Sequence, residues 1–526
     1  MFQASKVAVI LAASALASSA QAADRCAALK NFKLPGTVIS VTRAEEVPAG
    51  PPPPPPFPGI PPVKGTLPTH CIVEGTINPH KGGDGKDYSI GFAVALPNDW
   101  TGQFLFQGGG GTDGVLNPPI GKVDSVGLIG TGGNLGLARG MAVASTDSGH
   151  RSSAAFDASF FADQQSNLDF QYNSIGKVAE VAKAIIADYY KKPLAHSYFA
   201  GCSMGGREAM IAAQRYPLEF DGVISGAPAM RTAFSGIGDR WVSSVLTAIA
   251  PKDDKGKPIP DKALAESDKK LVISKLLEAC DDLDGVKDGM IFNVKACKFE
   301  PKSLQCKGSK TDACLSKAQV SALDKAFAGP KSSQGKQVYP GFYYDTGIAA
   351  TGFIPGLLQA STGPAGANPV LTGADVDRDA AAASSFFSNM TGDTNQWTDL
   401  GTFSGRGGKL IFFHGVSDPW FSAEDTVDYY GRLSEASGGP EKTQAFSRLF
   451  LVPGMGHCGG GPAALDEFDA LTPLIDWVEH NKPPESLTAT GHDFPGRSRP
   501  LCAYPRHAQY KGSGDPNDAA NFECKD

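Results

Sequence analysis

Ser197-Tyr-Phe-Ala-Gly-Cys-Ser-Met-Gly-Gly-Arg207 is the stretch that decides the fold. The apolar run Ser197 to Ala200 predicts a short strand, and the residues from Gly206 to Arg215 predict a helix. Between them, residues 201–205 match G-x-S-x-G, the sharp strand-to-helix turn that presents a nucleophilic serine above a sheet. The pattern predicts Ser203 as a nucleophile, with the amide of Met204 as an oxyanion donor at the helix N-terminus. The alternative is a glycine-rich β–α turn with an incidental serine.

Strands and helices alternate on both sides of this turn. Helical spacing covers residues 172–190 and 471–480, and seven short apolar runs predict strands. This rhythm is typical of a doubly wound, mostly parallel α/β sheet. It is interrupted over residues 229–405, which we interpret as a large inserted lid domain between core segments 23–228 and 406–526. The expected strands are 88–96, 103–106, 141–144, 197–200, 221–225, 409–413 and 448–452.

The partners of a serine nucleophile should follow it in the order acid, then histidine, each after a strand. The strand at 409–413 is followed by Asp418, and the strand at 448–452 is followed by His457. We therefore predict a triad in which His457 accepts the proton of Ser203 and Asp418 fixes the histidine tautomer. His414 competes for the role of base, but it precedes the acid. A structural loop histidine is the alternative for His457.

A glycine run offers the second half of an oxyanion hole. Gly108 to Gly111 and Thr112 directly follow the strand at 103–106, and glycines allow backbone N–H groups to approach a developing negative charge. A dinucleotide site is the rival interpretation. It is disfavoured because no G-x-G-x-x-G here opens a helix with an acidic residue about 20 positions later.

The cysteines and the N-terminus point to export. Residues 1–22 combine one lysine, a short apolar run and an A-x-A site, as in a secretory signal peptide. All ten cysteines come later, and an even number in an exported chain suggests disulfides. Short spacing along the chain favours disulfides between neighbouring cysteines. If the triad assembles, Cys202 and Cys458 come close enough to form a disulfide. The alternative for Cys202 and Cys458 is two free buried thiols. The pairs expected are Cys26–Cys71, Cys280–Cys297, Cys306–Cys314, Cys502–Cys524 and Cys202–Cys458.

Composition excludes several classes of function. A net charge of −7 over 526 residues argues against nucleic acid or an anionic membrane as a partner. No run of about 18 apolar residues follows the leader, so no membrane span is expected. The prolines at 51–56 cannot donate backbone hydrogen bonds, and we interpret them as an extended loop spacer in preference to a ligand for a proline-binding module.

An acidic turn suggests a metal. Four carboxylates fall within residues 281–288, and hard oxygen ligands at such close spacing suit Ca²⁺. The predicted ion is structural, because the turn lies in the insertion and far along the chain from the triad. A solvated acidic turn held by a disulfide is the alternative. The expected ligands are the side chains of Asp281, Asp284 and Asp288 and the carbonyls of Val286 and Met290.

These motifs resemble the tannase and feruloyl esterase family, whose hallmark is a disulfide between the neighbours of the catalytic serine and histidine. The likeness extends from Cys26 to Cys524 and rests on four stretches. They are Gly-Cys-Ser-x-Gly-Gly-Arg-Glu around Ser203, Cys-Asp-x-Leu-Asp-Gly-x-x-Asp-Gly around Asp284, Arg-Leu-Phe-Leu-Val-Pro-Gly-Met near Met455, and Tyr-Lys-Gly-Ser-Gly-Asp near Tyr510.

The resemblance implies an α/β-hydrolase fold with a lid, five disulfides matching the family's pairs, and a calcium loop. It places the second oxyanion amide at Gly111 and implies an aromatic-acid pocket with Phe421 in its wall. The implied function is a secreted serine carboxylesterase that acts on small aromatic-acid esters of the terephthalate monoester, feruloyl or galloyl type through an acyl-enzyme. A peptidase or thioesterase with the same triad, or a non-catalytic calcium-stabilised binding module, are the other hypotheses.

One departure from the family is informative. Members that hydrolyse terephthalate monoesters carry a lid arginine that holds the free carboxylate, whereas this lid is shorter between about Tyr344 and Thr398. No arginine aligns with that position, and Arg378 and Arg406 are the two candidates to replace it. The preferred acyl group therefore stays open at this point.

Overall fold

A computed structural model describes residues 22–54, 62–122, 135–154, 156–352, 354–359, 375–385 and 391–526. The expected leader, apart from Ala22, and residues 55 and 56 of the proline run lie outside these ranges. Residues 51–54 have no regular secondary structure and are mostly exposed.

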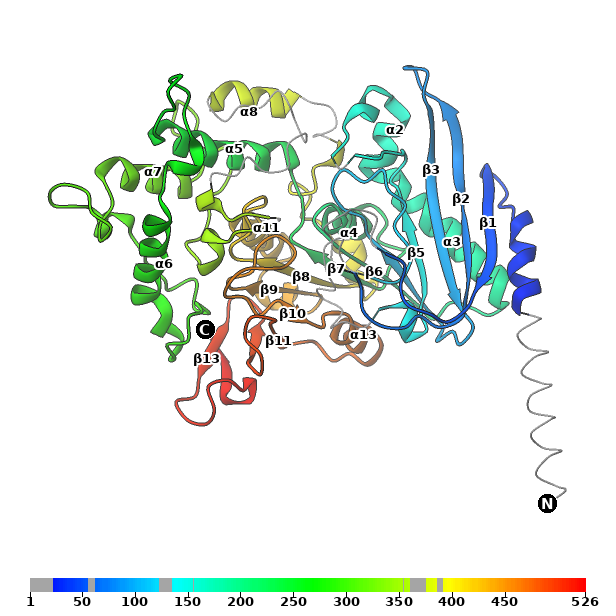
Figure 1. Ribbon diagram of the computed structural model, residues 1–526. Coiled ribbons are helices and arrows are strands. Elements are labelled where there is room, and N and C mark those ends of the chain that lie inside the picture. Colours follow the sequence, from blue (N-terminus) through cyan, green and yellow to red (C-terminus); the bar gives the residue numbers. More distant parts are fainter. Residues whose placement is uncertain are drawn as a thin grey trace.

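A nine-stranded sheet forms the centre of the molecule (Figure 1), with the strand order β1-β2-β3-β5-β4-β6-β7-β8-β9. Six strands run parallel to one another, namely β5, β4, β6, β7, β8 and β9. Strands β1, β2 and β3 extend the sheet as antiparallel neighbours. The strands are β1 Ile39–Val47, β2 His70–Lys81, β3 Asp87–Pro97, β4 Gln103–Gln107, β5 Ala142–Thr146, β6 His196–Cys202, β7 Gly222–Gly226, β8 Lys409–Gly415 and β9 Ser447–Val452.

Helices cover both faces of the parallel part. Along β4, Phe104 and Phe106 pack into the cluster beneath α3 (Ser174–Tyr190), α4 (Met204–Arg215) and α11 (Ala423–Ala436). Leu105, between them, points to the opposite face and packs in the cluster of α13 (Leu471–His480). Successive strand residues face opposite sides, so strands covered on both faces must be apolar throughout, as these are. The α/β-hydrolase fold expected from the sequence is thus confirmed.

The long stretch between β7 and β8 contributes the helices α5 (Thr232–Ile249), α6 (Glu266–Cys280), α7 (Lys317–Phe327), α8 (Val376–Ser385) and α10 (Gly401–Gly405). In Figure 1 the green helices α5, α6 and α7 and the yellow α8 gather to one side, away from the blue strands β1 to β3. They share small cores of their own, in which α5 packs against α7 and α8. Their assignment to a separate lid domain, residues 229–405, stays a prediction.

The remaining elements are short. The helices are α2 Gln164–Leu168 and α12 Pro440–Gln444; the strands are β10 Glu467–Phe468, β11 Ser486–Thr490, β12 Ser498–Cys502, β13 His507–Tyr510 and β14 Phe522–Lys525. None of the helices in the described ranges combines the length and apolarity needed to cross a membrane. All five expected disulfides are present.

Candidate active site

The serine turn has the backbone of a nucleophile elbow. Ser203 lies between the last residue of β6 and the first residue of α4. Its backbone angles, φ 64° and ψ −122°, are rarely adopted by residues other than glycine. The flanking glycines are required sterically. A Cβ at Gly201 would lie 2.5 Å from the carbonyl oxygen of Gly205, and one at Gly205 would lie 2.7 Å from that of Gly109. The local sequence therefore holds Ser203 out of the sheet and into a cavity.

The acid and the base come from the loops after β8 and β9. The Nδ1 of His457 lies 2.7 Å from Oδ2 of Asp418, and both side chains are buried. With Asp418 ionised, Nδ1–H donates this hydrogen bond, which leaves Nε2 as the basic nitrogen. The arrangement is that of the acid–base half of a serine hydrolase triad.

Asp418 is held as an anion. Its Oδ1 accepts hydrogen bonds from the backbone N–H groups of Trp420, at 2.9 Å, and Phe421, at 3.0 Å. Burial by itself would raise the pKa of Asp418, but the hydrogen bonds and charges of His457 and His414 lower it well below its usual range. Asp418 is therefore ionised at neutral pH.

His414, the competing base, has a different role in the structure. Its Nδ1 pairs with Oγ1 of Thr426 at 2.8 Å, and its Nε2 lies 2.9 Å from the carbonyl oxygen of Phe421 and 3.3 Å from Oδ2 of Asp418. Because both ring nitrogens are engaged and the side chain is fully buried, His414 does not line the cavity. Through its contact with Asp418, His414 helps to hold the carboxylate in place.

The disulfide Cys202–Cys458 joins the immediate neighbours of Ser203 and His457. Its Cα atoms are 6.1 Å apart, although 256 positions separate the two residues along the chain. The bond thus ties the turn after β6 to the loop after β9, and Sγ of Cys458 lies 3.7 Å from Nε2 of His457.

Removing this disulfide should lower activity before it unfolds the protein. For the pair of changes Cys202→Ala and Cys458→Ala we expect kcat/KM to fall about tenfold to 100-fold, because small displacements of reacting groups are costly. The matched control is Cys306→Ala with Cys314→Ala, a disulfide of the segment between β7 and β8. Kinetics and thermal melting of both variants check this; equal activity losses, or a loss of activity only where the fold is lost, would contradict it.

Two backbone N–H groups are candidates for an oxyanion hole. Met204 is the first residue of α4, so its N–H has no acceptor within the helix. Gly111 has φ 64° in the loop after β4, and both residues line the cavity together with Ser203.

Buried carboxyl groups hold the loop that carries Gly111. Oε2 of Glu208 accepts a hydrogen bond from the N–H of Gly109 at 2.8 Å. The hydroxyl of Ser148 lies 2.6 Å from Oδ2 of Asp113 and 2.8 Å from Oε1 of Glu208. Burial, together with the charge of Glu208, raises the pKa of Asp113 well above its usual value.

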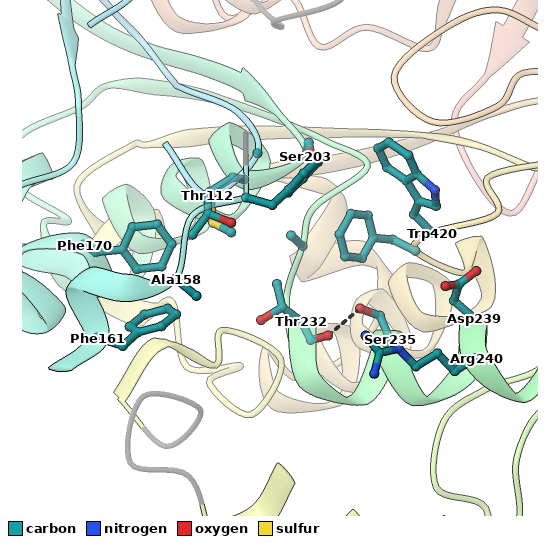
Figure 2. A pocket seen from close by; sticks show the side chains of 16 residues that line it. Thr112, Ala158, Phe161, Phe170, Ser203, Thr232, Ser235, Asp239, Arg240 and Trp420 are labelled. Atoms are coloured by element: carbon teal, nitrogen blue, oxygen red, sulfur yellow. Dashed lines mark hydrogen bonds between the residues drawn. The ribbon is translucent and has the colours of Figure 1, made fainter. Parts of the chain in front are cut away.

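Aromatic side chains dominate the cavity above Ser203 (Figure 2). The cavity and its mouth together enclose about 810 Å³. Phe421 is among its walls, as the resemblance implied, and the rings of Trp420 and Phe421 lie 4.9 Å and 5.1 Å from that of His457. The opposite wall is one face of α5. The aromatic walls are Phe156, Phe161, Phe170, Trp420 and Phe421.

A comparison with protein families matches residues 71–397 and 370–525 to the model described as tannase and feruloyl esterase. The chain belongs to the tannase and feruloyl esterase family. As a family member it is a carboxylic ester hydrolase.

Named relatives of this esterase are similar over most of their length. The mono(2-hydroxyethyl) terephthalate hydrolase of Piscinibacter sakaiensis is 37% identical, covering 87% of this chain and 85% of its own. A probable feruloyl esterase of Arthroderma benhamiae is 30% identical, covering 95% and 93%. The crystal structure of feruloyl esterase B from Aspergillus oryzae has a TM-score of 0.76 at 24% identity, covering 96% of this chain and all of that one, and so shares the fold.

Neither arginine considered for a carboxylate clamp lines the cavity of this esterase. Arg406 bonds to the carbonyl oxygen of Phe220 and to Asp221, and Arg378 pairs with Asp379. Arg240 of α5 does line it, and so does Asp239. Sequence reasoning missed both, although the helical spacing of Thr232, Ser235, Asp239 and their neighbours on one face was a usable signal.

The acidic turn has some of the features of a cation site. One carboxylate oxygen of Asp284, Oδ2, is buried without a hydrogen-bond partner, and burial together with the charges of Asp288 and Asp281 raises the pKa of Asp284 to about 7. Asp288 is already paired with Arg499, and Asp281 accepts hydrogen bonds from the N–H groups of Asp288 and Gly289. Within the described ranges no three His, Cys, Asp or Glu side chains converge as a metal centre. A cation would therefore depend on Asp284, Asp281 and backbone carbonyls.

Proposed function

We propose that this protein is an exported serine esterase that hydrolyses small aromatic-acid esters through an acyl-enzyme on Ser203. The observation that carries the proposal is that Ser203 opens into a cavity walled by five aromatic side chains. Aromatic walls bury a planar acyl group with favourable stacking geometry. The names of the relatives point to the same substrate class, since one is a terephthalate monoester hydrolase and others are probable feruloyl esterases.

The geometry suggests the roles of each residue. His457 takes the proton of the Ser203 hydroxyl as its oxygen attacks the ester carbonyl, and Asp418 stabilises the resulting imidazolium. The N–H groups of Met204 and Gly111 bind the oxyanion. His457 then protonates the departing alcohol, and water attacks the acyl-enzyme with His457 again acting as the base.

A panel of matched esters and amides tests the proposed function. We expect hydrolysis of methyl ferulate, methyl gallate or the mono(2-hydroxyethyl) ester of terephthalate, with kcat/KM at least 100-fold above that for the corresponding anilides, because an ester has the better leaving group. Release of the free acid, followed by chromatography, gives the rates. Faster cleavage of amides, or of thioesters alone, would instead favour a peptidase or a thioesterase.

We also propose that Ca²⁺ stabilises the turn at residues 281–290. The carboxylates of Asp281 and Asp284 and the carbonyls of Val286 and Met290 would hold the ion, with Asp288 contributing only if it is released from Arg499. Support comes from the buried unpaired oxygen of Asp284 and from the mutual repulsion of these carboxylates.

Removal of calcium should lower the melting temperature. An ion present at about 100 times its Kd stabilises a protein by about 2.7 kcal/mol, which is a shift of several degrees for a domain of this size. EDTA should therefore lower the Tm of the wild type and leave that of Asp284→Asn unchanged. Calorimetry with and without the chelator checks this, and an identical response of the two proteins would refute the site.

Export follows from the expected leader at residues 1–22 and gains support from the five disulfides, which form in oxidising compartments. Mass spectrometry of the protein from culture medium or periplasm should show an N-terminus at residue 23, give or take one position.

A further inference from the structure

The loops that carry the acid and the base of the triad touch each other next to both residues. The backbone N–H of Ser417 donates a hydrogen bond to the carbonyl oxygen of Met455 at 3.0 Å. Ser417 directly precedes Asp418, and Met455 lies two positions before His457. The spacing between the carboxylate and the imidazole therefore depends on how firmly these two loops are held together.

A carboxyl group from the long segment between β7 and β8 joins the same two loops. Oδ2 of Asp345 accepts a hydrogen bond from the hydroxyl of Ser417 at 2.7 Å and another from the backbone N–H of Gly454 at 2.6 Å. Ser417 belongs to the loop after β8, and Gly454 belongs to the loop after β9. A single oxygen atom thus links the loop of Asp418 to the loop of His457.

The backbone that follows Asp345 lies directly against both loops. The N–H of Gly347 donates to Oγ of Ser417 at 2.9 Å. A Cβ at Gly347 would lie 2.4 Å from the carbonyl oxygen of Gly454 and 2.7 Å from Oγ of Ser417. Even one added methyl group would force these segments apart, so Asp345 is presented to the two loops at a close-packed contact.

Local structure does not account for the burial of Asp345. The residue is 0% exposed and precedes the short 3₁₀ helix Thr346–Ala349, yet its side chain does not cap that helix. Its second oxygen, Oδ1, has no hydrogen-bond partner among the described residues. A buried carboxyl oxygen left unpaired costs stability, so the two hydrogen bonds to the triad loops are the interactions that explain an aspartate at this position.

We propose that Asp345 is a positioning residue of the triad, which fixes the loop of Asp418 against the loop of His457. The segment between β7 and β8 then contributes to catalysis itself, in addition to walling the cavity. The inference rests on the proposed function, because it concerns the acid and the base of the proposed acyl-enzyme mechanism. Asp345 acts through Ser417 and Gly454 and is not a catalytic residue, since it does not line the cavity.

Two ferulate esters report the position of His457 differently. With methyl ferulate, His457 must take the proton of the Ser203 hydroxyl and then give a proton to the departing methoxide. With 4-nitrophenyl ferulate the second transfer is not needed, because 4-nitrophenolate is a stable leaving group. A displaced His457 therefore slows acylation by the methyl ester more than acylation by the nitrophenyl ester, whereas a smaller folded fraction slows both equally.

Asp345→Leu removes both hydrogen bonds and keeps a similar side-chain volume. We expect kcat/KM for methyl ferulate to fall about 30-fold to 100-fold, because small displacements of reacting groups are costly. The loss of kcat/KM for 4-nitrophenyl ferulate should be at least about fivefold smaller. KM for methyl ferulate should change by less than about twofold, since the walls of the cavity are intact.

Two further variants test the hydrogen bonds themselves. Asp345→Asn keeps an oxygen that can accept from Ser417 and Gly454, so it should retain at least about a third of kcat/KM and the wild-type ratio of the two esters. Burial raises the pKa of Asp345, but Oδ2 can accept both bonds in either protonation state, which makes the amide a close substitute. Ser417→Ala removes one of the two bonds and should shift the ester ratio in the same direction as Asp345→Leu, by a smaller factor.

The matched control is Asp268→Leu, which also removes a buried carboxyl group of the segment between β7 and β8. Asp268 is 1% exposed and bonds to Gln319 at 2.7 Å and to Lys310 at 2.7 Å. None of these residues belongs to the triad loops. The control variant should therefore lower the melting temperature and leave both the ester ratio and KM unchanged.

Initial rates of ferulate release, followed by chromatography, provide the measurement. An unchanged ester ratio in the folded variants Asp345→Leu and Ser417→Ala would overturn the positioning role, and so would a loss in Asp345→Asn as large as that in Asp345→Leu. If Asp345→Leu does not fold, Ser417→Ala decides alone. Failure of the wild type to hydrolyse either ester would instead refute the proposed function, whereas Ser203-dependent hydrolysis with unchanged ratios would refute only the role of Asp345.

Discussion

Ser203→Ala should reduce kcat for ester hydrolysis by about 10⁴-fold to 10⁶-fold, since loss of a nucleophile leaves only the binding and oxyanion contributions. The strained turn at Ser203 is held by Gly201 and Gly205 and by the disulfide at Cys202, none of which this change removes. The fold and the melting temperature should therefore persist.

The matched control is Ser309→Ala, an exposed serine in the segment between β7 and β8. Initial rates with methyl ferulate and circular dichroism of both variants provide the measurement. Substantial activity in Ser203→Ala would show that another group attacks the ester, and the assignment of the site would fail.

Asp418→Asn should lower kcat by about 10⁴-fold. The carboxylate accepts from Nδ1 of His457 at 2.7 Å, and an amide in its place can hold the imidazole in the wrong tautomer. KM should change much less, because Asp418 lies behind the histidine and does not line the cavity.

The same substitution should destabilise the protein at neutral pH. The pKa of Asp418 is lowered in the folded state, so its ionised form stabilises the fold above its unfolded pKa of about 3.9. This contribution is lost as the pH falls through the lower, folded value. The gap in unfolding free energy between wild type and Asp418→Asn should thus be wide at pH 7 and narrow towards strongly acidic pH, as urea titrations would show. A gap independent of pH, with kcat unaffected, would contradict the role of this carboxylate.

Most residues of the candidate site can be predicted from short stretches of sequence, for physical reasons. The turn at Ser203 needs small residues at fixed offsets, so a short motif is enough to reveal it. Asp418 and His457 could be found because they follow apolar strands that the parallel sheet places side by side. Parity of the cysteines then suggested Cys202–Cys458, and the structure contains that bond.

Other parts depend on contacts far apart in the sequence. Strand β1 carries Arg43, Glu45 and Glu46 at the sheet edge, so its hydrophobic pattern is weak and its place is decided by pairing with β2. The helices between β7 and β8 are similar: composition marked an insertion, but packing on α7 and α8 decides which face of α5 meets the cavity.

Trapping the acyl-enzyme tests the central claim most directly. The protein would be mixed with excess 4-nitrophenyl ferulate, quenched in acid within the first turnovers and digested for mass spectrometry. Our account predicts a feruloyl group on the peptide that contains Ser203 in the wild type and none on that peptide in Ser203→Ala. Turnover without acylation of Ser203, or the same adduct at another residue in both proteins, would contradict it.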